Sequence, residues 1–244
     1  MALYSIADLH LSHTANKPMD KFGSRWTGHT EKIKTNWSRL VTDTDTVVIP
    51  GDISWAMELA EAADDLLFID SLPGKKIISR GNHDYWWATV AKMKSFLGEL
   101  GISSIDFLQN NAFFAEGAII AGSRGWYIEP KFQNTQSPTD YKKIVARECV
   151  RLELSLDAAE KLREKHNGSP VLVYLHFPPV FGDFVCRPIV DVMKKHAVKN
   201  CFFGHIHGKY SVPQSTVYEG VKMTLISADF LDFIPYRTDA FPQI

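Results

Sequence analysis

The sequence predicts an α/β fold in which two β-sheets pack together and helices cover their outer faces. Strand-length apolar runs alternate with amphipathic helix-length stretches through the first half of the chain, which indicates a parallel sheet. Around residues 105–121 and 216–227, short apolar runs follow one another across turns, which indicates antiparallel strands. Hydrophobic residues make up 45% of the 244 residues, enough for a large core.

In the first half, strands are expected at residues 3–7, 46–50 and 76–79, and helices at 31–41, 58–72 and 87–100. Thr30 is a plausible N-cap for the first helix, because its hydroxyl can accept a hydrogen bond from a backbone N–H of the first turn. Pro73-Gly74 is expected to end the second helix, and Gly101 the third. Residues 11–29 form a long polar loop, and loops of that length in a compact domain are often functional.

In the second half, strands are expected at residues 105–108, 112–115, 118–121, 171–175 and 200–203, and helices at 139–166 and 188–196. Residues 216–227 are expected to form a hairpin with Glu219-Gly220 at its turn. Residues 122–138 form a second irregular segment. Because no repeat, low-complexity segment or linker interrupts the sequence, we expect a single domain over residues 1–244.

Composition and charge exclude several classes of protein. The formal net charge of -1 disfavours a general nucleic-acid binder, which needs a basic field. No apolar run approaches the roughly 18 residues that a membrane span needs, and the N-terminus lacks the pattern of a signal peptide. Three scattered cysteines without a Cys-x-x-Cys motif favour a reducing, cytoplasmic location.

Polar side chains of metal-binding types follow five of the predicted strands. They are Asp8 and His10, Asp52, Asn82 with His83, His176, and His205 with His207. Ligands of open α/β sheets bind at the carboxyl ends of the strands, so these residues are expected at one edge. Each residue alone is more often a turn, cap or structural residue. Their joint occurrence at five strand ends predicts a metal centre.

The spacing of these residues adds geometry. In Asp8-Leu9-His10 and His205-Ile206-His207, residues two apart in an extended segment point the same way, so each pair could reach one small centre. Gly51, Gly81 and Gly204 lie next to the ligand candidates or one residue away. Glycine permits a sharp turn at the end of a strand and a close backbone approach to a cluster.

Taken in order, the blocks Asp8-x-His10, Gly51-Asp52, Gly81-Asn82-His83-Asp84, His176 and Gly204-His205-x-His207 resemble the signature of the calcineurin-like metallophosphoesterase superfamily. The resemblance implies a four-layer α/β/β/α sandwich with two mixed β-sheets. It also implies that Asp8, His10 and His207 hold one metal and that Asn82, His176 and His205 hold another, with Asp52 as the bridge. His83 would lie beside the substrate without binding metal.

These residue types suit hydrolysis of phosphate esters. Imidazole and carboxylate ligands favour two divalent ions, with Mn expected first and Fe, Zn, Ni or Mg as alternatives. Such a pair activates a hydroxide that attacks phosphorus and offsets charge on the phosphoryl oxygens. His83 is the candidate general acid for the leaving alcohol. Asp84 either assists a histidine in catalysis, by orienting it or stabilising its charge, or caps the helix that follows.

The superfamily's protein Ser/Thr phosphatases carry Gly-Asp-x-x-Asp-Arg-Gly at the second block, and residues 51–57 lack its second Asp and its Arg. This departure lowers the expectation of a phosphoprotein substrate. Candidate substrate contacts are Arg124, Trp126 and His13, since Arg suits phosphate and Trp can stack on a base or sugar. The alternatives for them are a surface ion pair, a core aromatic residue and an ordinary loop residue.

The sequence thus predicts an enzyme that hydrolyses a phosphomonoester or phosphodiester, with a nucleotide-type substrate as one option. An exonuclease-like member of the same superfamily is a second hypothesis, which the near-neutral charge disfavours. A scaffold that keeps the fold without hydrolysis is a third, although degraded metal blocks would then be expected. A redox metalloprotein is a fourth. The physiological substrate, the native metals and the oligomeric state stay open.

Overall fold

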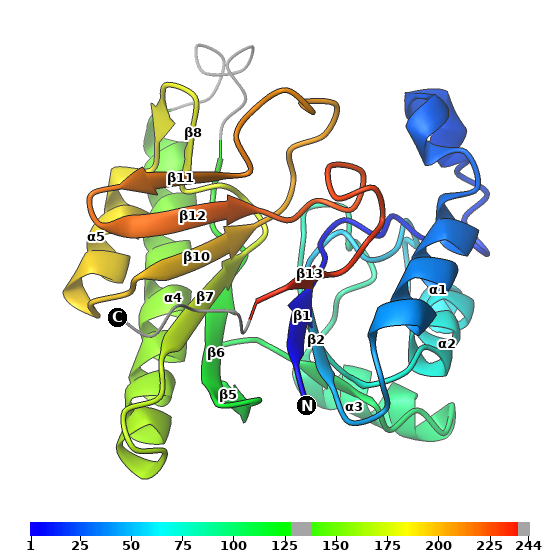
Figure 1. Ribbon diagram of the computed structural model, residues 1–244, viewed down its shortest axis with the longest axis horizontal. Coiled ribbons are helices and arrows are strands. Elements are labelled where there is room, and N and C mark those ends of the chain that lie inside the picture. Colours follow the sequence, from blue (N-terminus) through cyan, green and yellow to red (C-terminus); the bar gives the residue numbers. More distant parts are fainter. Residues whose placement is uncertain (128–137, 239–244) are drawn as a thin grey trace.

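The computed structural model describes residues 1–127 and 138–238. Two β-sheets pack face to face, and helices cover the outer face of each (Figure 1). This is the predicted fold class, with four layers in the order α/β/β/α. Most of the irregular segment at 122–138 lies outside the described residues.

The first sheet has the strand order β13-β1-β2-β3-β4. Four of its strands, β1 (Leu3–Ser5), β2 (Thr46–Pro50), β3 (Lys75–Ser79) and β4 (Ile105–Phe107), are mutually parallel, and β13 (Tyr236–Arg237) pairs antiparallel with β1. The helices α1 (His29–Leu40), α2 (Ala63–Ser71) and α3 (Val90–Glu99) lie on its outer face (Figure 1). The short 3-10 helices are η1 (Met19–Phe22), η2 (Ser24–Trp26) and η3 (Leu59–Ala62).

The second sheet has the order β11-β12-β10-β7-β6-β5. The strands β6 (Ala118–Ser123), β7 (Val171–Leu175), β10 (Asn200–Phe203) and β12 (Val221–Leu225) are parallel, and β5 (Phe113–Ala115) and β11 (Ser215–Tyr218) are antiparallel edges. The helices α4 (Pro138–Lys165) and α5 (Arg187–Lys195) cover its outer face (Figure 1). The strands β8 (Val180–Phe181) and β9 (Phe184–Val185) form a small hairpin.

The central strands are apolar on both faces because each sheet is covered on both sides. In β2, Val47 and Ile49 pack toward the helices, whereas Val48 packs between the sheets. Leu172 and Tyr174 of β7 belong to the same inter-sheet core as Val48. This shared layer fixes the two sheets against each other, so that the carboxyl ends of strands from both can meet at one place.

Several helix starts differ from the prediction. Helix α1 begins at His29, so Thr30 lies inside it, and Gly28 occupies the N-cap with a φ of 64°. The predicted helix at 58–72 begins instead with η3, whose Glu58 and Glu61 form a capping box, and continues as α2. Such local caps compete with simple hydrophobic periodicity in deciding where a helix begins.

The strands predicted at 105–108 and 112–115 are not neighbours. β4 pairs with β3 in the first sheet, whereas β5 pairs with β6 in the second, so the connection between β4 and β5 crosses from one sheet to the other. The predicted hairpin at 216–227 is confirmed as β11 and β12. The sequence did not predict the strand pair β8–β9 or the strand β13, because two-residue strands carry no periodic signal.

Candidate metal centre

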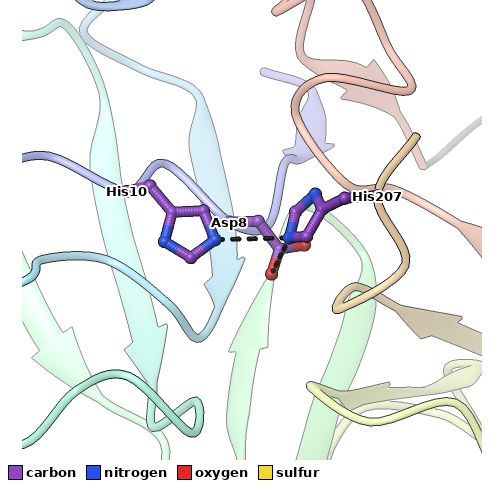
Figure 2. Close-up of side chains that lie close together, drawn as sticks. All are labelled: Asp8, His10 and His207. Carbon is purple, nitrogen blue, oxygen red and sulfur yellow. Dashed lines mark hydrogen bonds and ion pairs between the residues drawn. The ribbon is translucent and has the colours of Figure 1, made fainter. Parts of the chain in front are cut away.

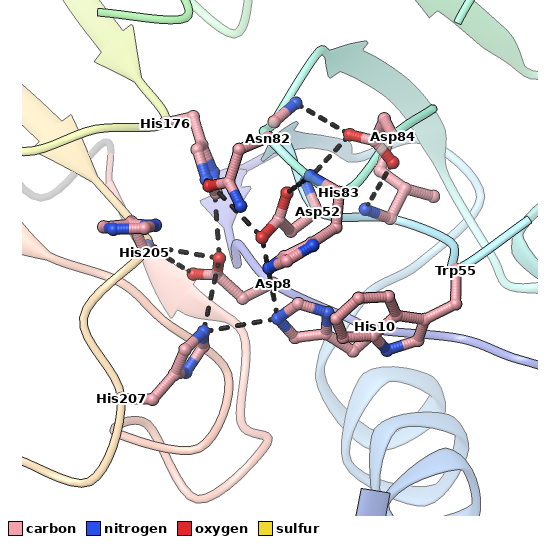
Figure 3. Close-up of polar contacts among 12 residues, drawn as sticks. Asp8, His10, Asp52, Trp55, Asn82, His83, Asp84, His176, His205 and His207 are labelled. Carbon is pink, nitrogen blue, oxygen red and sulfur yellow. Dashed lines mark hydrogen bonds and ion pairs between the residues drawn. The ribbon is translucent and has the colours of Figure 1, made fainter. Parts of the chain in front are cut away.

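The carboxyl ends of strands from both sheets converge on one cluster of polar side chains (Figure 3). Asp8 follows β1, Asp52 follows β2, and His205 follows β10. Asn82 and His176 follow β3 and β7 in the same way. The rule that ligands lie beyond the carboxyl ends of strands therefore places these residues correctly.

The first group consists of Asp8, His10 and His207 (Figure 2). Nε2 of His10 lies 3.2 Å from Nε2 of His207, which in turn lies 3.7 Å from Oδ1 of Asp8. One donor atom from each residue lies within 4.8 Å of the others. Two imidazole nitrogens and a carboxylate at this spacing can hold one divalent ion.

The second group consists of Asp52, His176 and His205, whose donor atoms also lie within 4.8 Å of one another. Oδ1 of Asn82 lies 2.7 Å from Nε2 of His176, so the amide can join this group as a fourth donor. Nδ1 of His176 faces the carbonyl oxygen of Pro50 at 3.2 Å, which leaves Nε2 for a metal.

Asp52 lies between the two groups (Figure 3). Its Oδ2 is 3.7 Å from Nε2 of His10 and 3.5 Å from Nε2 of His176. This oxygen is buried and has no hydrogen-bond partner among the described residues, whereas Oδ1 accepts a hydrogen bond of 2.8 Å from the backbone N–H of His83. A buried carboxylate oxygen without a protein donor fits a cation at that position.

The backbone at these positions is not extended, contrary to the argument from i, i+2 spacing. Asp8, His10, Asp52 and His205 all have positive φ, between 47° and 69°. Non-glycine residues rarely adopt this left-handed conformation, which costs about 1–3 kcal/mol and concentrates at functional sites. The chain therefore turns sharply at the end of each strand. Asp8 and His10 belong to one group, whereas His205 and His207 belong to different groups.

Glycines allow this close packing, as their positions predicted. A Cβ at Gly81 would collide with Oδ1 and the backbone nitrogen of Asp52. A Cβ at Gly204 would collide with Oδ2 of Asp8. In each case the atom that would be displaced belongs to a candidate ligand.

Asp84 contacts backbone rather than a histidine side chain. Its carboxylate accepts hydrogen bonds from the backbone N–H groups of residues 52, 53, 54 and 81, and from Nε1 of Trp86. The helix that follows begins at Val90, and Thr89 is its N-cap. The predicted helix-capping role of Asp84 is therefore wrong, because its carboxylate holds the loop after β2 against the loop after β3. Its predicted assistance to a histidine stays a prediction.

His83 lies at the edge of the cluster. Its ring stacks at a tilt on Trp55, with ring centroids 4.2 Å apart, and its centroid is 5.7 Å from that of His10. Nζ of Lys17, from the long first loop, lies 3.4 Å from the centroid of the Trp55 ring. Burial lowers the pKa of His83, and the charge of Asp52 opposes that shift.

Burial and neighbouring charges shift the pKa values of the residues in the cluster. Burial raises the pKa of Asp8 to about 8 and lowers that of His205 to about 2. His207 differs, because Asp8 and Asp229 overcome the effect of burial and raise its pKa to about 9. Several buried carboxylates and imidazoles with displaced pKa values at one place are typical of a functional site.

Asp229 is a component that the sequence analysis missed. Nδ1 of His207 donates a hydrogen bond of 2.8 Å to Oδ1 of this fully buried carboxylate. The backbone N–H of Gly208 and the hydroxyl of Tyr210 donate to Oδ2. Asp229 lies just beyond the end of β12, so the strand-end rule that found the other residues could have found it.

Two of the three candidate substrate contacts lie beside the second group. The carbonyl of Arg124 accepts a hydrogen bond of 2.9 Å from the N–H of Phe177, the residue after His176. The Trp126 ring packs against that of Phe177, with centroids 5.3 Å apart. His13 instead contacts Asp65 of α2, with Nδ1 2.6 Å from Oδ1, which anchors the first loop.

Comparison with known proteins agrees with the fold and the cluster. Residues 1–209 match the calcineurin-like phosphoesterase family, and the chain belongs to this family of metal-dependent phosphoesterases. The fold class and the resemblance predicted from the sequence are thus confirmed.

Solved structures with a similar fold are distant in sequence. The protein TT1561 of Thermus thermophilus is 12% identical with a TM-score of 0.56, over 94% of this chain and 91% of that one. A protein of unknown function, AQ665 from Aquifex aeolicus, is 18% identical with a TM-score of 0.48, over 97% and 95% of the two chains. No curated protein matches the sequence. No helix in the described part combines the length and apolar character needed to cross a bilayer.

Proposed function

We propose that the protein is a dinuclear metallohydrolase that cleaves a phosphomonoester or phosphodiester. The observation that carries this proposal is Asp52, whose Oδ2 has no hydrogen-bond partner among the residues that the structure describes and lies between two groups of histidine and carboxylate donors. Asp8, His10 and His207 would hold one divalent ion, and Asn82, His176 and His205 the other. When bound, two such ions activate water and offset charge on the phosphoryl oxygens.

The chain's own residues would orient and protonate the substrate. His83 lies beside the cluster and would donate a proton to the leaving oxygen. Burial favours its neutral form, but an anionic phosphate nearby would raise its pKa again and restore the proton. Trp55 covers one side of His83, which would limit access of bulk water.

The proposal is tested by hydrolysis assays with purified, metal-loaded protein. The panel comprises bis-aryl phosphate, aryl monophosphate, nucleotides and cyclic nucleotides, each with Mn, Mg, Zn and Ni. We expect metal-dependent release of alcohol or phosphate from at least one ester. Hydrolysis of no ester with any metal would contradict the proposal.

The bridging role of Asp52 is tested separately. Asp52→Asn removes the negative charge that would offset two cations, so metal content and activity should fall together. Elemental analysis measures metal per chain for the variant and the wild type. Asp106→Asn, which alters only an exposed ion pair with Lys94, is the matched control. Full metal occupancy in Asp52→Asn would refute the bridge.

A further inference from the structure

A small polar cavity lies beside the candidate metal centre. Its volume is about 200 Å³, and it is lined by residues at the ends of β3, β4 and β6 and by residues of α4, with one side open to solvent. Arg80 directly precedes Gly81-Asn82, and Arg124 is hydrogen-bonded to the segment after His176. Two residues that line the cavity thus belong to segments that carry or contact the residues of the second donor group.

Arginine side chains dominate the charge of this cavity. Arg80, Arg124 and Arg151 line it together with one carboxylate, that of Glu148. Oε1 of Glu148 lies 2.6 Å from Nη1 of Arg151 and 3.6 Å from Nη2 of Arg124. One negative charge thus faces three positive ones, which leaves an excess of positive charge.

Two of the guanidinium groups have N–H donors without hydrogen-bond partners among the described residues. Within the described part of the chain, Arg80 forms no ion pair, and the buried Nε atoms of Arg80 and Arg124 lack hydrogen-bond partners. Unpaired buried donors are costly, so a site that retains them is expected to have a ligand that accepts from them. Guanidinium groups present paired N–H donors that match phosphate oxygens.

The size and walls of the cavity limit that ligand. A volume of about 200 Å³ is smaller than the usual pocket for a drug-sized molecule, so it suits a compact group. Trp87 and Leu108 form an apolar side, and the indole N–H of Trp87 already donates to Gln109 at 2.6 Å. The polar recognition therefore comes from the arginines.

We propose that this cavity binds a second phosphate group of the substrate, so that the enzyme acts on compact esters that carry two phosphates. This inference rests on the proposed function only for the hydrolysis of the first phosphate. Binding of a phosphate group by Arg80 and Arg124 is independent of hydrolysis, and can be measured without it.

The first test measures binding of inorganic phosphate to EDTA-treated protein by calorimetry. Arg80→Gln is the main variant, because it removes a guanidinium without unpairing a carboxylate of the described chain. We expect it to weaken phosphate binding by about tenfold or more. Arg163→Gln, at an exposed pair with Glu160 near the end of α4, is the matched control. Equal affinity in wild type and Arg80→Gln would overturn the proposal.

Arg124→Lys provides a second variant that keeps the charge but loses the paired donors of the guanidinium. We expect weaker phosphate binding here as well, with thermal unfolding as the check on folding. If Arg124→Lys folds and binds phosphate like the wild type, the assigned recognition is wrong.

The second test uses the metal-loaded enzyme and a short series of alkanediol bisphosphates, each compared with its monophosphate. The wild type should prefer the bisphosphate in kcat/KM, and Arg80→Gln should reduce that preference by about tenfold. A series of ω-carboxyalkyl phosphates tests whether the second anionic group must be a phosphate. If the wild type prefers these esters over the monophosphates as strongly as it prefers the bisphosphates, the assignment of the cavity to phosphate is overturned. If no ester is hydrolysed, the proposed function fails, while the calorimetric test still decides on the cavity.

Discussion

Asp229 accepts a hydrogen bond from Nδ1 of His207 at 2.8 Å, and this contact turns Nε2 of His207 toward Asp8 and His10. A carboxylate behind a histidine fixes the tautomer and orientation of the ring and makes its free nitrogen a better metal ligand. Asp229 also accepts from Gly208 and Tyr210, so the segment after β10 is tied to the segment after β12.

Asp229→Asn should therefore weaken metal binding while the fold persists. An amide at this position cannot stabilise the same charge on His207, and we expect the affinity for the divalent ion to fall by about 10- to 100-fold. Competition with a chelating dye measures this affinity. Asp191→Asn, an exposed partner of Arg187, is the control. Unchanged affinity in Asp229→Asn would show that His207 needs no such support.

The stability of the metal-free protein should fall as the pH rises from about 7 to about 8. His207 has its pKa raised from 6.5 to about 9, and Asp8 has its pKa raised to about 8. In this window the folded chain binds more protons than the unfolded chain, so the free energy of unfolding decreases with pH. The histidines with lowered pKa oppose this trend near pH 6.5, where the unfolded chain still binds part of their protons, and their contribution fades as the pH rises above about 7.

Thermal unfolding of EDTA-treated protein between about pH 7 and pH 8 measures this trend. Above pH 8 the trend should weaken, because burial lowers the pKa of Lys76 to about 8 and its contribution has the opposite sign. Asp229→Asn removes one cause of the raised pKa of His207, so its decline should be shallower. A melting temperature that rises with pH in this window would contradict the assignment.

Asp84→Asn should destabilise the protein without touching a candidate ligand side chain. The amide nitrogen would face backbone N–H donors of residues 52, 53, 54 and 81 that now point at a carboxylate. We expect the free energy of unfolding to fall by about 2 kcal/mol or more. Urea denaturation measures it, with Asp106→Asn as the control. A difference below about 0.5 kcal/mol would mean that the loops do not depend on Asp84.

Gly204→Ala should reduce metal content, because the new methyl group would displace the carboxylate of Asp8. Gly98→Ala is a matched control: it lies in α3, has ordinary φ, and no atom lies within 4 Å of its added methyl group. We expect Gly98→Ala to be neutral or stabilising by up to about 1 kcal/mol. Elemental analysis and thermal unfolding of both variants check the pair. Equal metal content in the two would refute the steric argument.

His83→Ala should keep its metals and lose most of its turnover on esters with poor leaving groups. Loss of a general acid typically costs about 10²- to 10⁴-fold in rate. The loss should be smaller for aryl esters, whose leaving groups need less protonation. Steady-state kinetics on an alkyl and an aryl ester measure the difference. Unchanged turnover of the alkyl ester would exclude His83 as the acid.

The sequence by itself determined the fold class and the candidate ligands. Buried parallel strands are short apolar runs, and polar residues directly after them must lie at the carboxyl edge of a sheet. Asp8, Asp52 and His176 were therefore found from local sequence alone, without any knowledge of the packing. The hairpin β11–β12 was found in the same way, because its Glu219-Gly220 turn is a local signal.

Only the tertiary structure decided how these residues share the site. The chain crosses from the first sheet to the second between β4 and β5. The core between the sheets then brings the ends of β2 and β7 together. The support of His207 by Asp229 and the support of two loops by Asp84 are contacts between residues distant in sequence. No periodicity encodes such contacts, because they depend on the orientation of packed elements rather than on the preference of any one segment.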